Sequence, residues 1–170
     1  TMGVFHDFQR FVIDQYSRRK RTILIVDEAQ NLSAETLEEL RMLSNINADK
    51  DQLLQIILVG QPELRDVLLG PELVQFVQRV SSDFHLLPLD AAEVYDYVRY
   101  RVQLAGGAPE LFSRQACKLV ADVSKGVPRT INMLCDTALV YAYSTGARYV
   151  SSGIMASVIS DKKKYGLSLR

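Results

Sequence analysis

A short apolar run that ends in two adjacent carboxylates is the feature that most constrains the fold of this chain. Residues 22–26 read TILIV, and Asp27 and Glu28 follow directly. A run of this kind is typical of a strand buried on both faces of a parallel sheet. Open parallel sheets bind their ligands beyond the carboxyl ends of the strands. The sequence therefore predicts an α/β fold with two acids at a ligand-binding edge.

Two further segments are predicted to be strands. Residues 53–59 are apolar and lead into Gly60 and Gln61, and residues 82–87 end at Pro88. Helical periodicity and capping residues predict helices before and between these strands, over residues 2–16, 33–47 and, interrupted at a Gly-Pro pair, 62–80.

From residue 90 onward the sequence predicts helices only. Asp90 and Glu93 form a capping-box pattern at the start of a helix that ends at Gly106 and Gly107. Further helices are predicted over residues 113–124, over 130–144 and from 151. We expect a partial α/β core over residues 1–88, a helical part over 89–160 and a solvated tail over 161–170.

Composition bounds the function only loosely. Twenty basic residues balance twenty acidic ones among 170, so the net charge indicates no strongly charged partner. The two cysteines, Cys117 and Cys135, match no metal or redox spacing and are expected to be free thiols. No run of eighteen apolar residues and no signal peptide is visible.

The acid pair and a nearby amide suggest phosphate chemistry. Asp27 can hold Mg²⁺, and Glu28 beside it can polarise a water for attack on a γ-phosphate. If the strands over residues 22–26 and 53–59 are neighbours, Gln61 lies close enough to Glu28 to orient that water. The competing interpretation is that the acids begin an ordinary loop and that Gln61 is a turn residue.

Two arginines are further candidates. Arg79, just ahead of the predicted strand over residues 82–87, can reach across a subunit boundary to a neighbour's phosphate. Arg129, in the sequence GVPRTIN, begins a helix and can report the state of a nucleotide. Each is open to a plainer interpretation, a surface arginine for Arg79 and a helix-start arginine paired with an acid for Arg129.

Taken together, these motifs resemble an AAA+ ATPase of the secretion-pathway protein A type, which includes ExeA-like and exosortase- or polysaccharide-export-associated ATPases. The resemblance covers residues 11–158. ILIVDEAQNLS resembles the family's Walker B motif, and LEELRMLSNINADKDQLLQIILVGQPELRD resembles the stretch through sensor 1. QRVSSDFHLLPLD resembles the arginine-finger region, and GVPRTINMLCDTAL resembles sensor 2.

The resemblance assigns a role to each candidate. It implies that Asp27 serves Mg²⁺, that Glu28 activates water and that Gln61 is sensor 1. It also implies that Arg79 is the arginine finger and that Arg129 is sensor 2, with Arg65 and Arg99 as alternative fingers. The helical part corresponds to the lid subdomain of the family.

The phosphate-binding P-loop of the family, GxxxxGK[ST], is missing from the sequence. None of the nine glycines is followed by lysine. In the family the P-loop strand lies between the sensor-1 strand and the strand after the arginine finger, so only three strands are recognisable. We therefore expect a fragment of a longer ATPase that binds no ATP or Mg²⁺ by itself. Its sheet is expected to close by pairing of residues 53–59 with 82–87, or by another chain.

The resemblance implies an oligomeric ATP-Mg²⁺ switch for secretion or envelope export. Its partners would be copies of itself and inner-membrane or cytoplasmic components of the machine. It would be cytoplasmic, or peripheral at the inner membrane. Two alternatives stay open: a non-enzymatic assembly scaffold of AAA+ shape, and an ATPase of transposition or replication type. Zero net charge and the lack of a recognisable DNA-binding helix count against a nucleic-acid partner.

Overall fold

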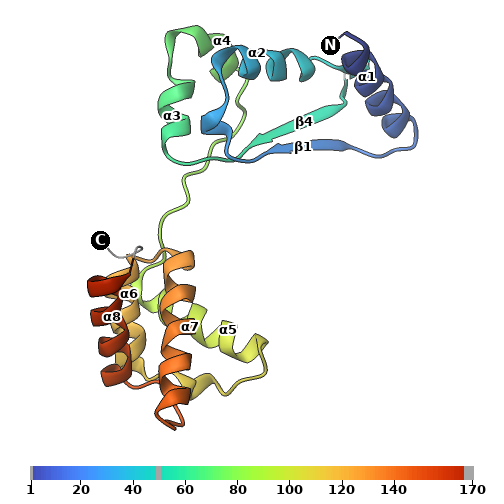
Figure 1. Cartoon of the computed structure of the whole chain (residues 1–170). Coiled ribbons are helices and arrows are strands. Elements are labelled where there is room, and N and C mark those ends of the chain that lie inside the picture. The colour runs from blue at the N-terminus through green and yellow to red at the C-terminus, as the bar shows by residue number, and fades with distance from the viewer. Residues whose placement is uncertain (1, 49–50, 167–170) are drawn as a thin grey trace. The chain divides into compact units, whose positions relative to one another are not determined.

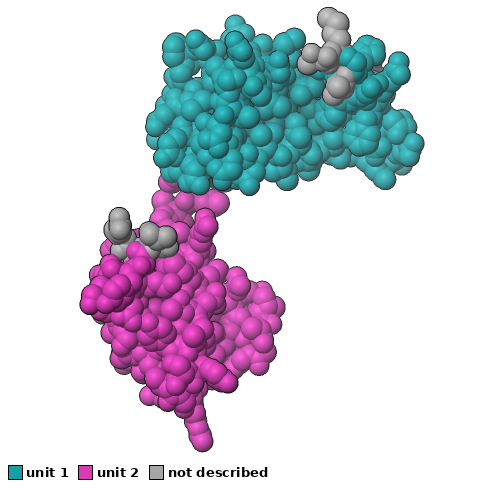
Figure 2. Space-filling view, viewed as in Figure 1, with its two compact units in different colours: residues 1–84 teal, residues 85–170 magenta. Residues whose placement is uncertain are grey.

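The chain divides into two compact units in a computed structural model that describes residues 2–48 and 51–166. Unit 1 spans Thr1–Phe84 and unit 2 spans His85–Arg170 (Figures 1 and 2). The division falls close to the boundary expected at Pro88, where the sequence changes from mixed to helical. Each unit has a hydrophobic core of its own.

Unit 1 is built on two parallel strands. Strand β1 (Thr22–Val26) pairs with β4 (Leu54–Leu58), with Val26 opposite Leu58 (Figure 1). The crossover between them contains α2 (Ala34–Leu43), whose N-cap Ser33 accepts a hydrogen bond from the Thr36 amide as predicted. The remaining elements of the unit are α1 (Met2–Ser17), η1 (Ala29–Asn31), β2 (Asn47–Ala48), β3 (Asp51–Gln52), α3 (Glu63–Leu68), η2 (Pro71–Leu73) and α4 (Val74–Val77).

One face of the β1–β4 pair is covered and the other is open. Leu24 and Ile56 pack with Val12 of α1 in a small core. Ile23 and Ile25 point to the opposite face and are 53% and 63% exposed. The prediction that residues 22–26 are buried on both faces is therefore wrong for the described chain, because its elements cover only one side of the sheet.

The predicted third strand over residues 82–87 is also not formed. These residues adopt no regular structure, and the side chains of Phe84 and Leu86 are each 90% exposed. The expected closure of the sheet by pairing of residues 53–59 with 82–87 is wrong. A strand needs a neighbour for its backbone hydrogen bonds, and the described residues offer this segment none.

Unit 2 is a bundle of helices. It contains α5 (Ala91–Leu104), η3 (Pro109–Leu111), α6 (Arg114–Ser124), α7 (Pro128–Ser144) and α8 (Ser152–Tyr165). The predicted capping box at the start of α5 is present, with Asp90 and Glu93 each bonding the other's backbone amide. The tail expected from residue 161 is wrong over residues 161–165, which form the end of α8.

The core of unit 2 joins its four α-helices. The helices contribute Val98, Val120, Leu134 and Val158, all at most 3% exposed. Burial of such aliphatic side chains contributes about 1.5–3 kcal/mol each before entropy is counted. In the part of the chain that the structure describes, none of the helices is both long and apolar enough to cross a bilayer.

Candidate functional site

The two predicted site motifs meet at the carboxyl edge of the β1–β4 pair. The backbone ladder continues past both strands, since the Val59 amide donates to Val26 O at 2.8 Å and the Ala29 amide donates to Val59 O at 2.9 Å. Ala29 is fully buried. The residues after β1 and those after β4 are thus held side by side, as expected for neighbouring parallel strands.

Asp27 and Glu28 form a tight backbone turn at this edge. The Glu28 amide donates to Asp27 Oδ1 at 2.8 Å. Glu28 itself has φ 54° and ψ 36°, in the left-handed region that a residue with a side chain rarely adopts. Such strain is concentrated at functional sites, where the surrounding structure holds it in place. Both carboxylates are exposed at the tip of the strand.

A glutamine outside the predicted set connects Glu28 with Gln61. The Gln30 Nε2 donates to Glu28 Oε2 at 2.6 Å, and its Oε1 accepts from the Gln61 backbone amide at 3.1 Å. The expected proximity of Glu28 and Gln61 is therefore present in the structure. The sequence showed only that Gln30 is polar and two residues beyond Glu28, while its partner lies 31 positions away.

The arginine candidates of unit 1 lie on other elements. Arg79 follows α4 and donates through Nη1 to Oδ1 of Asn45, beyond the end of α2. Arg65 lies on α3 and is exposed. Neither has a hydrogen bond to Asp27 or Glu28 among the described residues.

The two remaining candidate arginines, Arg129 and Arg99, belong to unit 2. Arg129 is exposed in the first turn of α7, directly after Pro128 at the first helical position. Arg99 on α5 lies over the ring of Tyr95, with its guanidinium carbon 5.4 Å from the ring centroid. Arg99 is thereby engaged within its own helix, whereas Arg129 is exposed at a helix start.

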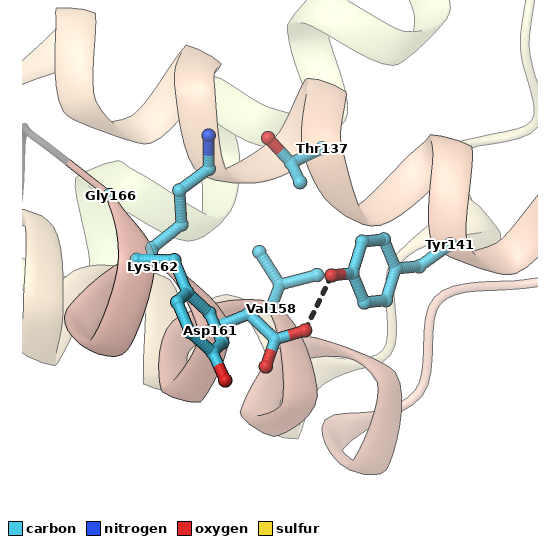
Figure 3. Close-up of a pocket in the computed structure, with 7 residues that line it drawn as sticks. Thr137, Tyr141, Val158, Asp161, Lys162 and Gly166 are labelled. Carbon is cyan, nitrogen blue, oxygen red and sulfur yellow. Dashed lines mark hydrogen bonds between the residues drawn. The ribbon is translucent and has the colours of Figure 1, made fainter.

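Two hollows in the described part of unit 2 are lined by none of the predicted site residues. One of about 310 Å³ lies between α7 and α8, where the Tyr141 hydroxyl donates to Asp161 Oδ2 at 2.6 Å (Figure 3). This hydrogen bond raises the pKa of Tyr141 above its ordinary value. A second hollow, also of about 310 Å³, lies between α5 and α7 and is lined in part by Arg101 and Cys135.

The two cysteines are free thiols, as predicted. Burial raises the pKa of Cys117 to about 11 and that of Cys135 to about 12. A thiol with so high a pKa stays protonated near neutral pH and is a poor nucleophile. Cys117 is buried in the core of unit 2, and Cys135 is partly buried and packs against that core.

Asp27 fits the magnesium role that the resemblance implies. Its Oδ1 accepts the Glu28 amide, and its Oδ2 has no hydrogen bond in the described part of the chain. Mg²⁺ is commonly held by one or two carboxylates together with waters and substrate phosphates. No group of three or more His, Cys, Asp or Glu residues that could hold a metal occurs among residues 2–48 and 51–166.

The chain is similar to known proteins over most of its length. Residues 4–68 match a family described as AAA domain. The chain is 43% identical over 134 residues to the General secretion pathway protein A of Aeromonas hydrophila, an alignment that covers 79% of this chain and 24% of that protein. The chain thus spans about a quarter of the length of the curated relative that it matches.

Solved structures share the fold at low sequence identity. The Holliday junction branch migration motor RuvB of Thermotoga maritima gives a TM-score of 0.61 at 15% identity, covering 94% of this chain and 51% of that one. The ORC2 protein of Aeropyrum pernix gives 0.66 at 19% identity, covering 90% of this chain and 42% of that one. The predicted α/β fold class and the resemblance to AAA+ proteins of the secretion-pathway protein A type are thereby confirmed.

Proposed function

We propose that this chain carries half of the nucleotide site of an oligomeric AAA+ ATPase that supports secretion or envelope polysaccharide or protein export. The observation that carries the proposal is the meeting of Asp27, Glu28 and the Gln61 loop at the carboxyl edge of two parallel strands. This edge is where open α/β sheets bind ligands. The similarity to General secretion pathway protein A supports the cellular role.

Each candidate residue has a separate role in the proposed ATP hydrolysis. Asp27 would hold Mg²⁺, and Glu28 would polarise the attacking water. Gln61 orients that water or contacts the γ-phosphate. Bound Mg-ATP supplies the phosphoanhydride that is cleaved. Arg79 acts on the nucleotide of a neighbouring protomer, and Arg129 reports the nucleotide state to the lid, which comprises residues 89–160.

We expect the phosphate-binding loop of the site to be supplied by a segment outside these 170 residues, as the resemblance implies. No glycine here is followed by lysine. One edge of β4 has no partner strand among the described residues, and the apolar residues of 82–87 are exposed. In the family that this chain resembles, a P-loop strand pairs with the sensor-1 strand, and such a strand would occupy the free edge of β4. We infer that the chain without that strand neither holds nucleotide tightly nor hydrolyses it.

The proposed function requires assembly of this protein with partners. The partners are further copies of this protein and inner-membrane or cytoplasmic components of a secretion or export machine. The protein acts in the cytoplasm or at the inner-membrane surface. One alternative has support in the sequence, namely a non-enzymatic scaffold of AAA+ shape, because the P-loop is missing from these residues.

ATP turnover by two forms of the protein separates these functions. We expect none from the 170-residue chain and measurable turnover from the gene product that includes the upstream sequence. In the longer form, Glu28→Gln should lower kcat by about 10²-fold or more, and the variant protein should still bind ATP. Glu39→Gln, at an exposed position on α2, is the matched control. Turnover by the short chain, or an unaffected Glu28→Gln variant, would contradict the proposal, and an inactive longer form would favour the scaffold.

A further inference from the structure

Among the described residues, the side chain of Gln30 makes the only hydrogen-bonded bridge between the Glu28 carboxylate and the Gln61 backbone. It reaches Glu28 Oε2 at 2.6 Å through Nε2 and the Gln61 amide at 3.1 Å through Oε1. No other hydrogen bond to the Glu28 carboxylate occurs among residues 2–48 and 51–166. The orientation of this carboxylate therefore depends on Gln30.

A primary amide suits both ends of this bridge. A carboxylate only accepts hydrogen bonds and a backbone amide only donates them, so the bridging group needs a donor at one end and an acceptor at the other. Glutamate at position 30 would lack the donor, and methionine would lack both groups. The bridge therefore requires the chemistry of glutamine and not merely its size.

The backbone on either side of the bridge is fixed. Ala29, buried between Glu28 and Gln30, donates its amide to Val59 O at 2.9 Å. Glu28 is held in the left-handed conformation with its amide on Asp27. The backbone on both sides of the bridge is therefore held in place by hydrogen bonds.

Gly60 leaves room for the bridge. A Cβ at position 60 would lie 2.6 Å from Gln30 Oε1, and 3.1 Å and 3.3 Å from two atoms of Leu64. The nearest of these atoms is the end of a long side chain, which can move away at low cost. Gly60→Ala is therefore expected to displace the Gln30 amide while the fold is retained.

We propose that Gln30 is a positioning residue that couples the Gln61 loop to the Glu28 carboxylate. The bridge orients the Glu28 carboxylate toward the attacking water. A shift of the Gln61 loop on contact with the γ-phosphate changes that orientation. The role in hydrolysis rests on the proposed ATPase function. The bridge itself is a property of the 170-residue chain and can be measured without nucleotide.

NMR of the isotope-labelled chain tests the bridge directly. Gln30→Met should move the backbone amide signal of Gln61, and Glu28→Gln should move the side-chain amide signals of Gln30. Gln75→Ala, at an exposed glutamine on α4, should move neither. Signals of Gln61 and Gln30 that stay in place in folded variants would overturn the bridge.

Steady-state kinetics of the longer gene product test the coupling. Gln30→Met and Gly60→Ala should each lower kcat about tenfold, with the KM for ATP within about twofold, because they disturb the base and not nucleotide binding. The double variant should be no slower than either single one, since both remove the same bridge. Gln30→Glu should not rescue the rate, and Gln75→Ala should match the unsubstituted protein.

The outcomes distinguish this inference from the proposed function. An unsubstituted longer protein without turnover overturns the ATPase function and with it the catalytic role of Gln30. Turnover that Gln30→Met leaves unchanged or accelerates overturns only the positioning role. Equal losses in kcat and in nucleotide affinity would show a structural effect and would also overturn it.

Discussion

The backbone amide of Leu89 donates to the carbonyl of Gly126 at 3.0 Å, and the missing side chain of Gly126 permits this approach. A Cβ at position 126 would lie 2.0 Å from Leu89 O. Gly126 also has φ +77°, a conformation that disfavours other residues. Gly126, in the GVPR motif, thus joins two segments by a backbone hydrogen bond. One segment is Leu89, which precedes the α5 cap, and the other is the turn before α7, where Arg129 lies.

Gly126→Ala should destabilise the chain strongly. The substitution adds a backbone clash to an unfavourable φ, so we expect a loss of more than about 2 kcal/mol in unfolding free energy. Urea denaturation followed by circular dichroism measures it. Gly106→Ala is the matched control, because Gly106 has φ +81° but no atom within 4 Å of the added Cβ. It should cost about 1 kcal/mol, and equal losses in the two variants would contradict the clash.

The exposed segment over residues 82–87 should tolerate polar substitution in the 170-residue chain. Phe84 and Leu86 are each 90% exposed, so replacing both with serine should change the unfolding free energy by less than about 0.5 kcal/mol each. Phe112→Ala, at a side chain only 4% exposed, should cost about 3–5 kcal/mol in the same assay. A loss above about 1 kcal/mol at Phe84 or Leu86 would mean that the segment packs.

The open face of the β1–β4 pair should make the isolated chain self-associate. Ile23, Ile25 and Ile57 are 53%, 63% and 40% exposed on one face of a two-stranded sheet. Unpaired strands with apolar side chains are sites of association, and lysine suppresses it. Ile25→Lys should raise the fraction of monomer that analytical ultracentrifugation detects. Ile13→Lys, at a side chain 46% exposed on α1, is the control, and an equal shift there would argue against the sheet.

The two thiols should make the unfolding free energy of the chain fall at alkaline pH. Burial raises the pKa of Cys117 to about 11 and of Cys135 to about 12 from an ordinary value of 9.0. Unfolded thiols ionise first, so the unfolded state is favoured as pH rises. The contribution is fully present below pH 9 and is lost as pH rises through the folded values.

Thiol labelling and pH-dependent unfolding check this expectation. At pH 8 the native chain should react slowly with DTNB and the urea-unfolded chain rapidly. Between about pH 9 and 11 the unfolding free energy should fall, and the fall should be shallower in a Cys117→Ala, Cys135→Ala variant. Rapid labelling of both thiols in the native chain would contradict their burial.

Much of the local structure follows from the sequence. The strand predicted over residues 22–26 is present, the one predicted over 53–59 is present over Leu54–Leu58, and the helices predicted from residues 33 and 90 begin at caps formed by Ser33 and Asp90. These features depend on residues within a few positions of one another, through helical periodicity, β-branched runs and capping side chains. The assigned roles of Asp27, Glu28, Gln61, Arg79 and Arg129 stay predictions.

Residue patterns along the chain were enough to predict strands at β1 and β4, the capped helices, the two acids at the tip of β1 and the missing P-loop. Which segments find partners depends on contacts between residues far apart in the chain. Residues 82–87 were predicted as a strand but have no strand neighbour among the described residues, and those residues leave the outer face of β1 uncovered. Gln30 acquired its place from a contact 31 positions away. Hydrogen-bond ladders and side-chain bridges join two segments, so the pattern of one segment cannot show whether the other is in reach.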